Sequence, residues 1–124
     1  MKQILDGITV VEVGNGPLSG MVGMVLADFG AQVVWFEYGQ SEREYRVWHR
    51  GKLRVSVNLA VAAGSAREDA AKIRQHILAS ADVFLTDLSA AALVQLGLNW
   101  SSLEPLRPDL IQGQILSLIH ISEP

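Results

Sequence analysis

The sequence predicts an α/β, Rossmann-like fold, with an open, mainly parallel, doubly wound sheet that carries helices on both faces. Short β-branched or apolar runs alternate with helix-like segments along the chain, and this rhythm is typical of such sheets. Residues that break regular structure separate the segments, as at Gly30, Gly97 and Pro108. Apolar residues make up 49% of the 124 residues, which is enough to build a hydrophobic core.

Five strands are expected from β-branched or alternating runs. The first run is β-branched and mostly apolar, which favours a strand buried on both faces of a parallel sheet. The third run alternates apolar with polar residues and predicts a half-exposed strand. The predicted strands comprise residues 8–13, 32–36, 55–59, 82–86 and 110–115.

Helices are expected between these strands. Gly20, Gly23 and Ala27 form a narrow stripe of small residues along the first helix, which lets that helix lie close to the sheet. A capping-box pattern begins at Ser65, and Ser89 can cap a further short helix. The predicted helical segments comprise residues 18–29, a stretch beginning after residue 65, residues 90–96 and residues 101–106.

The composition argues against several classes of function. The chain has no cysteine, and its three histidines share no metal-ligand spacing, so we expect no metal site. A net charge of -3 disfavours nucleic acid as a partner. No apolar run is long enough to span a membrane, and the N-terminus lacks a signal-peptide pattern. We therefore expect a cytoplasmic protein.

Two features predict anion binding, and they lead to different ligands. Half of the ten basic residues fall between Arg43 and Arg54, where Arg50 and Lys52, on either side of Gly51, are the best candidates for contact with phosphate. Separately, a Gly-x-Gly-x-x-x-Gly pattern begins at Gly14 between the first strand and helix, as in NAD(P)-binding Rossmann domains.

In that alternative, Glu37 at the end of the second strand would bind the ribose of the dinucleotide. Ligands of open α/β sheets bind outside the carboxyl ends of the strands. Asp87 follows a predicted strand at this edge and is the carboxylate best placed to meet a ligand.

Several segments, in this order and spacing, resemble the N-terminal part of the class III CoA-transferases of the CaiB/BaiF type, a family that also contains the α-methylacyl-CoA racemases. They are Leu-Asp-Gly-Ile at 5–8, Leu-Ala-Asp-Phe-Gly-Ala at 26–31, Arg-Gly-Lys at 50–52, Ala-Asp-Val at 81–83, Leu-Gly-Leu at 96–98 and Pro-Asp-Leu-Ile at 108–111.

The resemblance implies an enzyme that transfers CoA between an acyl-CoA and a carboxylic acid through intermediates on a catalytic aspartate. It also implies a homodimer of interlocked subunits, with CoA bound as a substrate. The family's aspartate lies beyond the last predicted strand, so residues 1–115 correspond to the N-terminal part of the large domain and lack it. The implied CoA contacts here are Arg50, Gly51, Lys52, Gly16 and Asp87.

Some positions depart from the family pattern. The loop at 86–91 reads Thr-Asp-Leu-Ser-Ala-Ala where the family commonly has Glu-Asn-Phe-Arg-Pro-Gly, and Gln95 replaces a frequent arginine. Residues 116–124 form a non-family tail, which resembles the translation of a transposon-end adapter used in sequencing libraries. Two further readings stay open beside the transferase: an α-methylacyl-CoA racemase fragment, and a non-catalytic interaction module.

Overall fold

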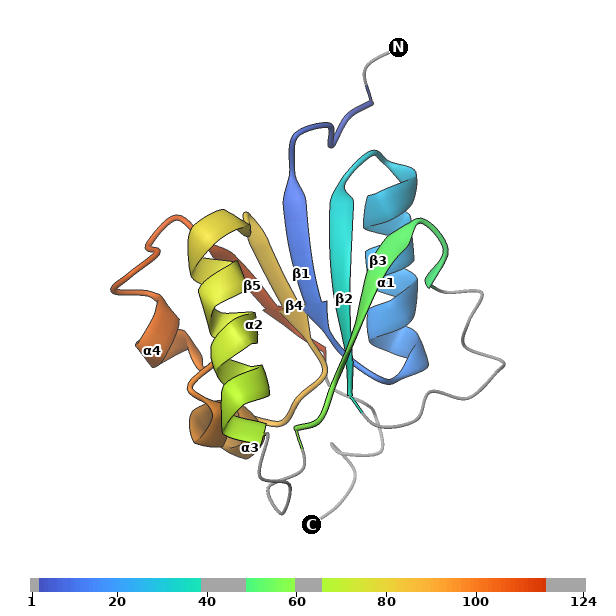
Figure 1. Ribbon diagram of the computed structural model, residues 1–124. Coiled ribbons are helices and arrows are strands. Elements are labelled where there is room, and N and C mark those ends of the chain that lie inside the picture. The colour runs from blue at the N-terminus through green and yellow to red at the C-terminus, as the bar shows by residue number, and fades with distance from the viewer. Residues whose placement is uncertain (1–2, 39–48, 60–65, 116–124) are drawn as a thin grey trace.

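The computed structural model describes residues 3–38, 49–59 and 66–115, and in this part of the chain five strands form one sheet (Figure 1). The strand order is β3-β2-β1-β4-β5, and all neighbouring strands are parallel. The strands are β1 (Thr9–Val13), β2 (Gln32–Tyr38), β3 (Lys52–Val57), β4 (Val83–Thr86) and β5 (Ile111–Gln114). The predicted parallel sheet is confirmed.

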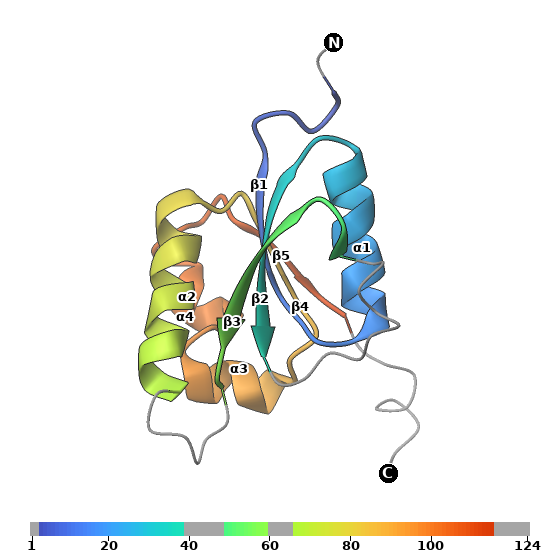
Figure 2. The same ribbon diagram turned by 45° about the vertical axis from the view of Figure 1, so that its right-hand side comes forward.

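Helices cover both faces of this sheet. In Figure 2, α1 lies on one face, and α2, α3 and α4 lie on the other. The helices are α1 (Pro17–Asp28), α2 (Ala66–Ser80), α3 (Ala90–Leu96) and α4 (Trp100–Leu103). This arrangement is the doubly wound one that the alternation of segments predicts.

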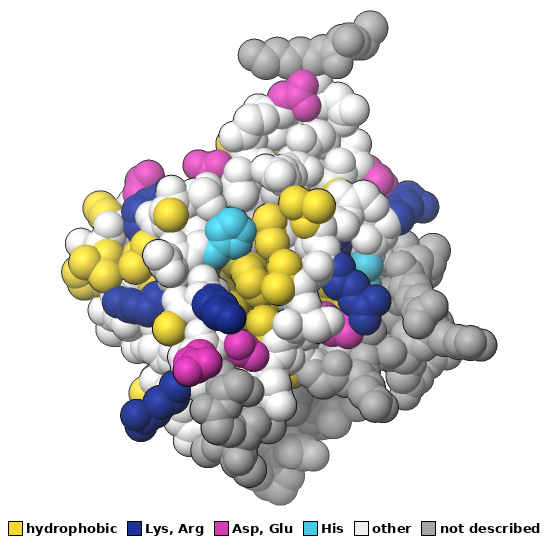
Figure 3. Space-filling view, in the orientation of Figure 1, with side chains coloured by type: hydrophobic (Ala, Val, Ile, Leu, Met, Phe, Trp, Pro, Cys, Tyr) yellow, Lys and Arg dark blue, Asp and Glu magenta, His cyan; other side chains and the backbone are white. Residues whose placement is uncertain are grey.

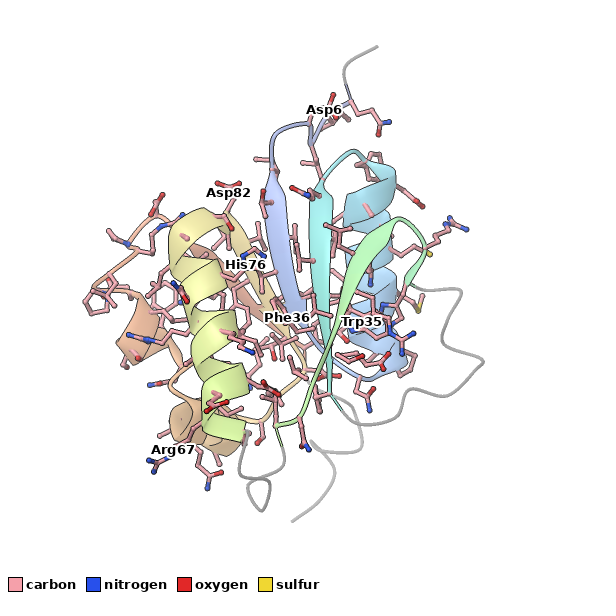
Figure 4. All side chains as sticks on the ribbon, viewed as in Figure 1. Asp6, Trp35, Phe36, Arg67, His76 and Asp82 are labelled. Carbon is pink, nitrogen blue, oxygen red and sulfur yellow. The ribbon has the colours of Figure 1, made fainter. Side chains whose placement is uncertain are left out.

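The sheet separates two apolar cores, because successive side chains of a strand point to opposite faces. On the α2 side, Val11 and Val13 of β1 pack in a cluster with Ile73 of α2. On the α1 side, Val10 packs with Val33 of β2. Figure 4 shows the same alternation in β2, where Trp35 points toward α1 and Phe36 points toward α2.

The small-residue stripe brings α1 close to the sheet, as predicted. Gly20 and Gly23 are buried. A Cβ atom on Gly23 would overlap the carboxylate of Glu12 on β1, so only glycine permits this approach. Pro17 begins the helix, where its missing N–H removes no hydrogen bond.

The predicted caps of α3 are confirmed, whereas α4 covers Trp100–Leu103 rather than residues 101–106. The Ser89 hydroxyl accepts a hydrogen bond of 3.2 Å from the backbone N–H of Ala92. Gly97 follows α3 in a left-handed conformation with φ of 72°. The buried residues of α2 follow spacings of four, three and four: Ala66, Ala70, Ile73 and Ile77. The capping residue predicted for this helix, Ser65, lies outside the described residues.

The third strand differs from its prediction. It begins at Lys52 rather than at residue 55, and it ends at Val57. Lys52 and Arg54 are therefore strand residues and not part of a basic loop. The side chains of Leu53 and Val55 point to the other face and are exposed. Figure 3 shows apolar side chains at the surface between β3 and α2.

Candidate functional site

A cavity of about 400 Å³ opens at the carboxyl edge of the sheet. The β1–α1 loop, the end of β2 and the residue after β4 form its wall. Its lining residues are Asn15, Gly16, Pro17, Leu18, Ser19, Tyr38, Asp87 and Ile115. Two of the predicted site residues, Gly16 and Asp87, thus lie together at the edge where open α/β sheets bind ligands.

Asp87 is the most highly connected polar residue of this cavity wall. Its Oδ2 accepts hydrogen bonds from the backbone N–H groups of Asn15, at 3.0 Å, and Gly16, at 2.9 Å. The Ser19 hydroxyl lies 3.4 Å from the same oxygen. The carboxylate thus occupies the N-terminus of α1, where the helix dipole favours negative charge.

Tyr38 holds the other oxygen of Asp87. The phenol O–H donates a hydrogen bond of 2.6 Å to Oδ1. Burial raises the pKa of Tyr38, and the bond to Asp87 and its charge raise the pKa further. The phenol therefore stays protonated, and it ties the end of β2 to the end of β4.

The glycines of the β1–α1 loop make room for this carboxylate. A Cβ on Gly16 would lie 3.2 Å from Asp87 Oδ2. In dinucleotide-binding folds, pyrophosphate lies at this helix N-terminus and the glycines admit it. Here a side chain of the protein itself fills the anion position. Glu37, the residue expected to bind ribose, instead contacts Arg54 at 2.6 Å.

A buried ion pair lies beneath α1, on the inner side of the same loop. The Lys52 ammonium lies 2.6 Å from Glu12 Oε1, and both side chains have no exposed surface. The ammonium also donates to the Gly20 carbonyl oxygen at 3.1 Å. Burial raises the pKa of Glu12 to about 7, although the charge of Lys52 pulls it down.

His49 completes this cluster. Its ring stacks on Trp35, with 3.4 Å between ring centroids and 4° between planes. Its Nδ1 lies 2.8 Å from the Lys52 ammonium and accepts a hydrogen bond from it. Burial and the charge of Lys52 lower the pKa of His49 to about 4, so the ring is neutral near pH 7. Sequence reasoning missed this cluster, because Glu12 lies on β1, 40 residues before Lys52, and only the folded sheet brings the two together.

Arg50 lies on the surface. Its guanidinium is 2.9 Å from the carboxylate of Asp28 at the end of α1, and its side chain is 60% exposed. Gly51 follows in a left-handed conformation, with φ of +77°, which suits a turn before β3. This turn therefore presents one exposed cation, while the ammonium of Lys52 is enclosed.

The predicted site residues form two groups, which lie at opposite ends of the strands. Gly16 and Asp87 lie at the N-terminal end of α1, whereas Arg50 and Gly51 lie beside its C-terminal end. The helix has 12 residues, so about 18 Å separates its two ends at 1.5 Å per residue. Lys52 connects the two, because it begins β3 near Arg50 and its side chain reaches the cluster under α1.

Within residues 3–38, 49–59 and 66–115, no group of three or more His, Cys, Asp or Glu side chains could hold a metal ion. No helix in the described part of the chain is long and apolar enough to cross a bilayer.

Curated proteins that are similar to this chain are CoA-transferases. The chain is 26% identical to succinate–glutarate CoA-transferase of Agrobacterium fabrum, over 92% of this chain and 32% of that protein. It is 28% identical to cinnamoyl-CoA:phenyllactate CoA-transferase of Clostridium sporogenes, over 90% of this chain and 30% of that protein. The chain thus spans about a third of the length of the curated relatives that it matches.

Solved structures share the fold. A CAIB/BAIF family protein from Brucella suis superposes with a TM-score of 0.71 at 24% identity, over 90% of this chain and 33% of that one. A hypothetical protein from Mycobacterium tuberculosis gives a TM-score of 0.73 at 24% identity, with the same coverage of 90% and 33%. The sequence pattern of CoA-transferase family III matches residues 5–117. The chain therefore belongs to CoA-transferase family III.

Proposed function

We propose that this chain is the N-terminal part of an enzyme that transfers CoA between an acyl-CoA and a carboxylic acid. Membership of CoA-transferase family III supports this, and so do the two curated relatives, which are both named CoA-transferases. The catalytic aspartate implied by the resemblance lies outside this chain. Its contribution is therefore to bind and orient the substrate, and the whole enzyme is a cytoplasmic homodimer of interlocked subunits.

The cavity at the carboxyl edge is the observation that carries this proposal. Leu18 and Ile115 give it apolar walls, and Asp87 gives it a negative charge held by main-chain N–H groups. A carboxylate repels phosphate, so this cavity suits the acyl or pantetheine part of an acyl-CoA better than its phosphates. Arg50, at the other end of α1, is an exposed cation that would exchange its pairing with Asp28 for a phosphate.

The same carboxylate disfavours the dinucleotide alternative. A pyrophosphate at the N-terminus of α1 would have to displace Asp87 from its bonds to the loop. Glu37 is also engaged with Arg54. An NAD(P) site needs the N-terminus of α1 for the pyrophosphate and Glu37 for the ribose. Both are engaged in contacts within the protein.

Calorimetric titration of the chain with CoA, acetyl-CoA and NAD tests the proposal. We expect CoA and its thioester to bind and NAD not to bind. Leu18→Glu adds a negative charge at the cavity and should weaken CoA binding about tenfold, a change of about 1.4 kcal/mol. Val22→Glu is the matched control, since Val22 lies one turn further along α1 and has similar exposure.

A second pair of variants tests the phosphate contact. Arg50→Ala should weaken binding of CoA, and Arg67→Ala, an exposed cation of α2, should leave it unchanged. Equal effects of these two variants would remove Arg50 from the site. Binding of NAD in place of CoA, or no binding of either, would count against the transferase proposal.

A further inference from the structure

The buried cluster of Glu12, His49 and Lys52 supports the cavity wall from beneath. Lys52 reaches the carbonyl oxygen of Gly20, at the C-terminal end of the loop and first helical turn formed by residues 14–20. Trp35, on which His49 stacks, donates its indole N–H to the Gly14 carbonyl oxygen at 2.8 Å. These two bonds fix both ends of the segment that lines the cavity.

The geometry of Lys52 is fully determined by this arrangement. An ammonium has three N–H donors, and here they point to Glu12, Gly20 and His49. Glu12 is the partner of the ammonium within a site that has no exposed surface. Glu12 projects from β1, so the ammonium is anchored to the central strand, which is paired on both sides.

Gly23 shows that the fold makes room for this ion pair. A Cβ at this position would overlap the Glu12 carboxylate and would lie 2.8 Å from the Lys52 ammonium. Apolar residues of similar volume could fill the same space and stabilise the fold without the cost of desolvating two charges. The specific contribution of the pair is therefore the hydrogen bond that it directs at the loop.

We propose that Lys52, anchored by Glu12, is a positioning residue that fixes the loop of residues 14–20 and thereby the wall of the cavity. This inference deepens the proposed function and rests on it for the identity of the ligand. It assigns Lys52 a role through the protein backbone. Lys52 itself does not touch the phosphates of CoA.

Hydrogen–deuterium exchange of the chain without ligand tests the inference directly. The Glu12→Gln/Lys52→Met double variant removes both charges together, so no unpaired charge stays buried. Amide exchange in residues 14–20 should accelerate about tenfold, as expected for the loss of a charge-assisted hydrogen bond. Exchange at core residues such as Ile73 and Phe84 should keep its original rate.

Arg107→Met is the matched control. Arg107 also fixes backbone carbonyls, those of Ile77, Leu78 and Ala81 at the end of α2, but it does not contact the loop. Its loss should accelerate exchange near residue 81 and not at 14–20. The inference is overturned if the double variant exchanges at the original rate in the loop, or if it exchanges faster by the same factor everywhere.

Titration with CoA separates this inference from the proposed function. If the unaltered chain binds CoA, the double variant should bind about threefold to tenfold more weakly, in line with one lost hydrogen bond, while Arg107→Met binds normally. Unchanged affinity in the double variant contradicts the positioning role. A chain that binds no CoA contradicts the proposed function, and the exchange experiment then decides the positioning role alone.

Discussion

At the scale of single residues, Asp87 sets the charge of the cavity. Its carboxylate accepts two backbone N–H bonds from the β1–α1 loop and one O–H bond from Tyr38. Bonds of this kind, in which the acceptor is charged, are about twice as strong as neutral ones. Asp87 therefore both stabilises the loop and determines which ligands the cavity admits.

Replacing Asp87 with Ala should lower the free energy of unfolding by about 2–3 kcal/mol, because two loop N–H groups and a phenol lose their acceptor. Asp87→Asn should have a smaller effect, since its side-chain carbonyl still accepts. Urea denaturation measures both. Asp109→Ala, which removes an exposed carboxylate paired with Arg107, serves as the control. Equal stability of the Asp87→Ala and Asp109→Ala variants would contradict the role of Asp87.

His49 gives the protein a pH-dependent stability. Its pKa falls from 6.5 in the unfolded chain to about 4 in the fold. Between these values the unfolded chain binds the proton more readily, so the contribution of His49 is present above pH 6.5 and is lost as the pH falls toward 4. Glu12 acts in the opposite sense, because its pKa is raised to about 7 and its burial as an anion opposes folding as the pH rises.

The His49→Phe variant isolates the first of these effects. Phe keeps a ring against Trp35 but does not titrate, and Glu12 is present in both proteins. The difference in unfolding free energy between the two proteins should change by up to about 3 kcal/mol between pH 6.5 and pH 4, with the native protein losing stability. Thermal denaturation at several pH values measures it. A constant difference would show that His49 is not buried as described.

At the scale of elements, α1 and β3 show what the sequence could and could not predict. The stripe of Gly20 and Gly23 predicted the close approach of α1 correctly, because helix periodicity is visible in the sequence. The predicted start of β3, residue 55, was three residues later than the observed start at Lys52. The alternation of polar and apolar residues does begin at Lys52, but buried lysines are rare, and its partner Glu12 comes from a distant strand.

The candidate site was predictable to the same degree. Gly16 and Asp87 were placed at the carboxyl edge, since each follows a predicted strand. Their direct contact was not predicted, because it depends on the order in which strands pair. Tyr38 was missed as the partner of Asp87 for the same reason. Local patterns locate the edge of the sheet, and only the topology brings its loops together.

Gly23→Ala tests the packing of α1. Alanine favours an isolated helix by about 1 kcal/mol over glycine. Here the added methyl overlaps the Glu12 carboxylate and crowds Lys52, so we expect a net loss of about 1–3 kcal/mol of stability. Met21→Ala, on the exposed side of the same helix, should change stability much less. A stabilised Gly23→Ala protein would mean that the helix lies further from the sheet.

At the scale of the whole molecule, exposed apolar side chains gather on α1 and on β3, among other positions of the described residues. The outward face of α1 carries a stripe of large apolar residues: Leu18, Met21, Val22 and Val25, with Phe29 just after the helix. The outer face of β3 exposes Leu53 and Val55. Contiguous apolar surface of this kind is uncommon on isolated monomers. The chain also spans about a third of the length of its curated relatives.

We therefore expect the chain alone to be poorly stable and to self-associate. Sedimentation velocity at increasing concentration should show growing assemblies, and a Met21→Lys/Val25→Lys variant should shift the distribution toward monomer because it interrupts the stripe. Ser101→Lys, which adds a charge on α4 outside the stripe, controls for net charge alone. A monomer that melts cooperatively at every concentration would contradict this expectation.

The position of β1 in the middle of the sheet has a consequence for synthesis on the ribosome. One neighbour, β2, follows β1 closely in the chain, whereas the other, β4, is translated much later. Closing the shorter loop costs less conformational entropy. We therefore expect β1 to pair first with β2, while the nascent chain is still growing. Until β4 joins it, the second edge of β1 is open to incorrect partners, so we expect misfolding and aggregation during synthesis to begin at this edge.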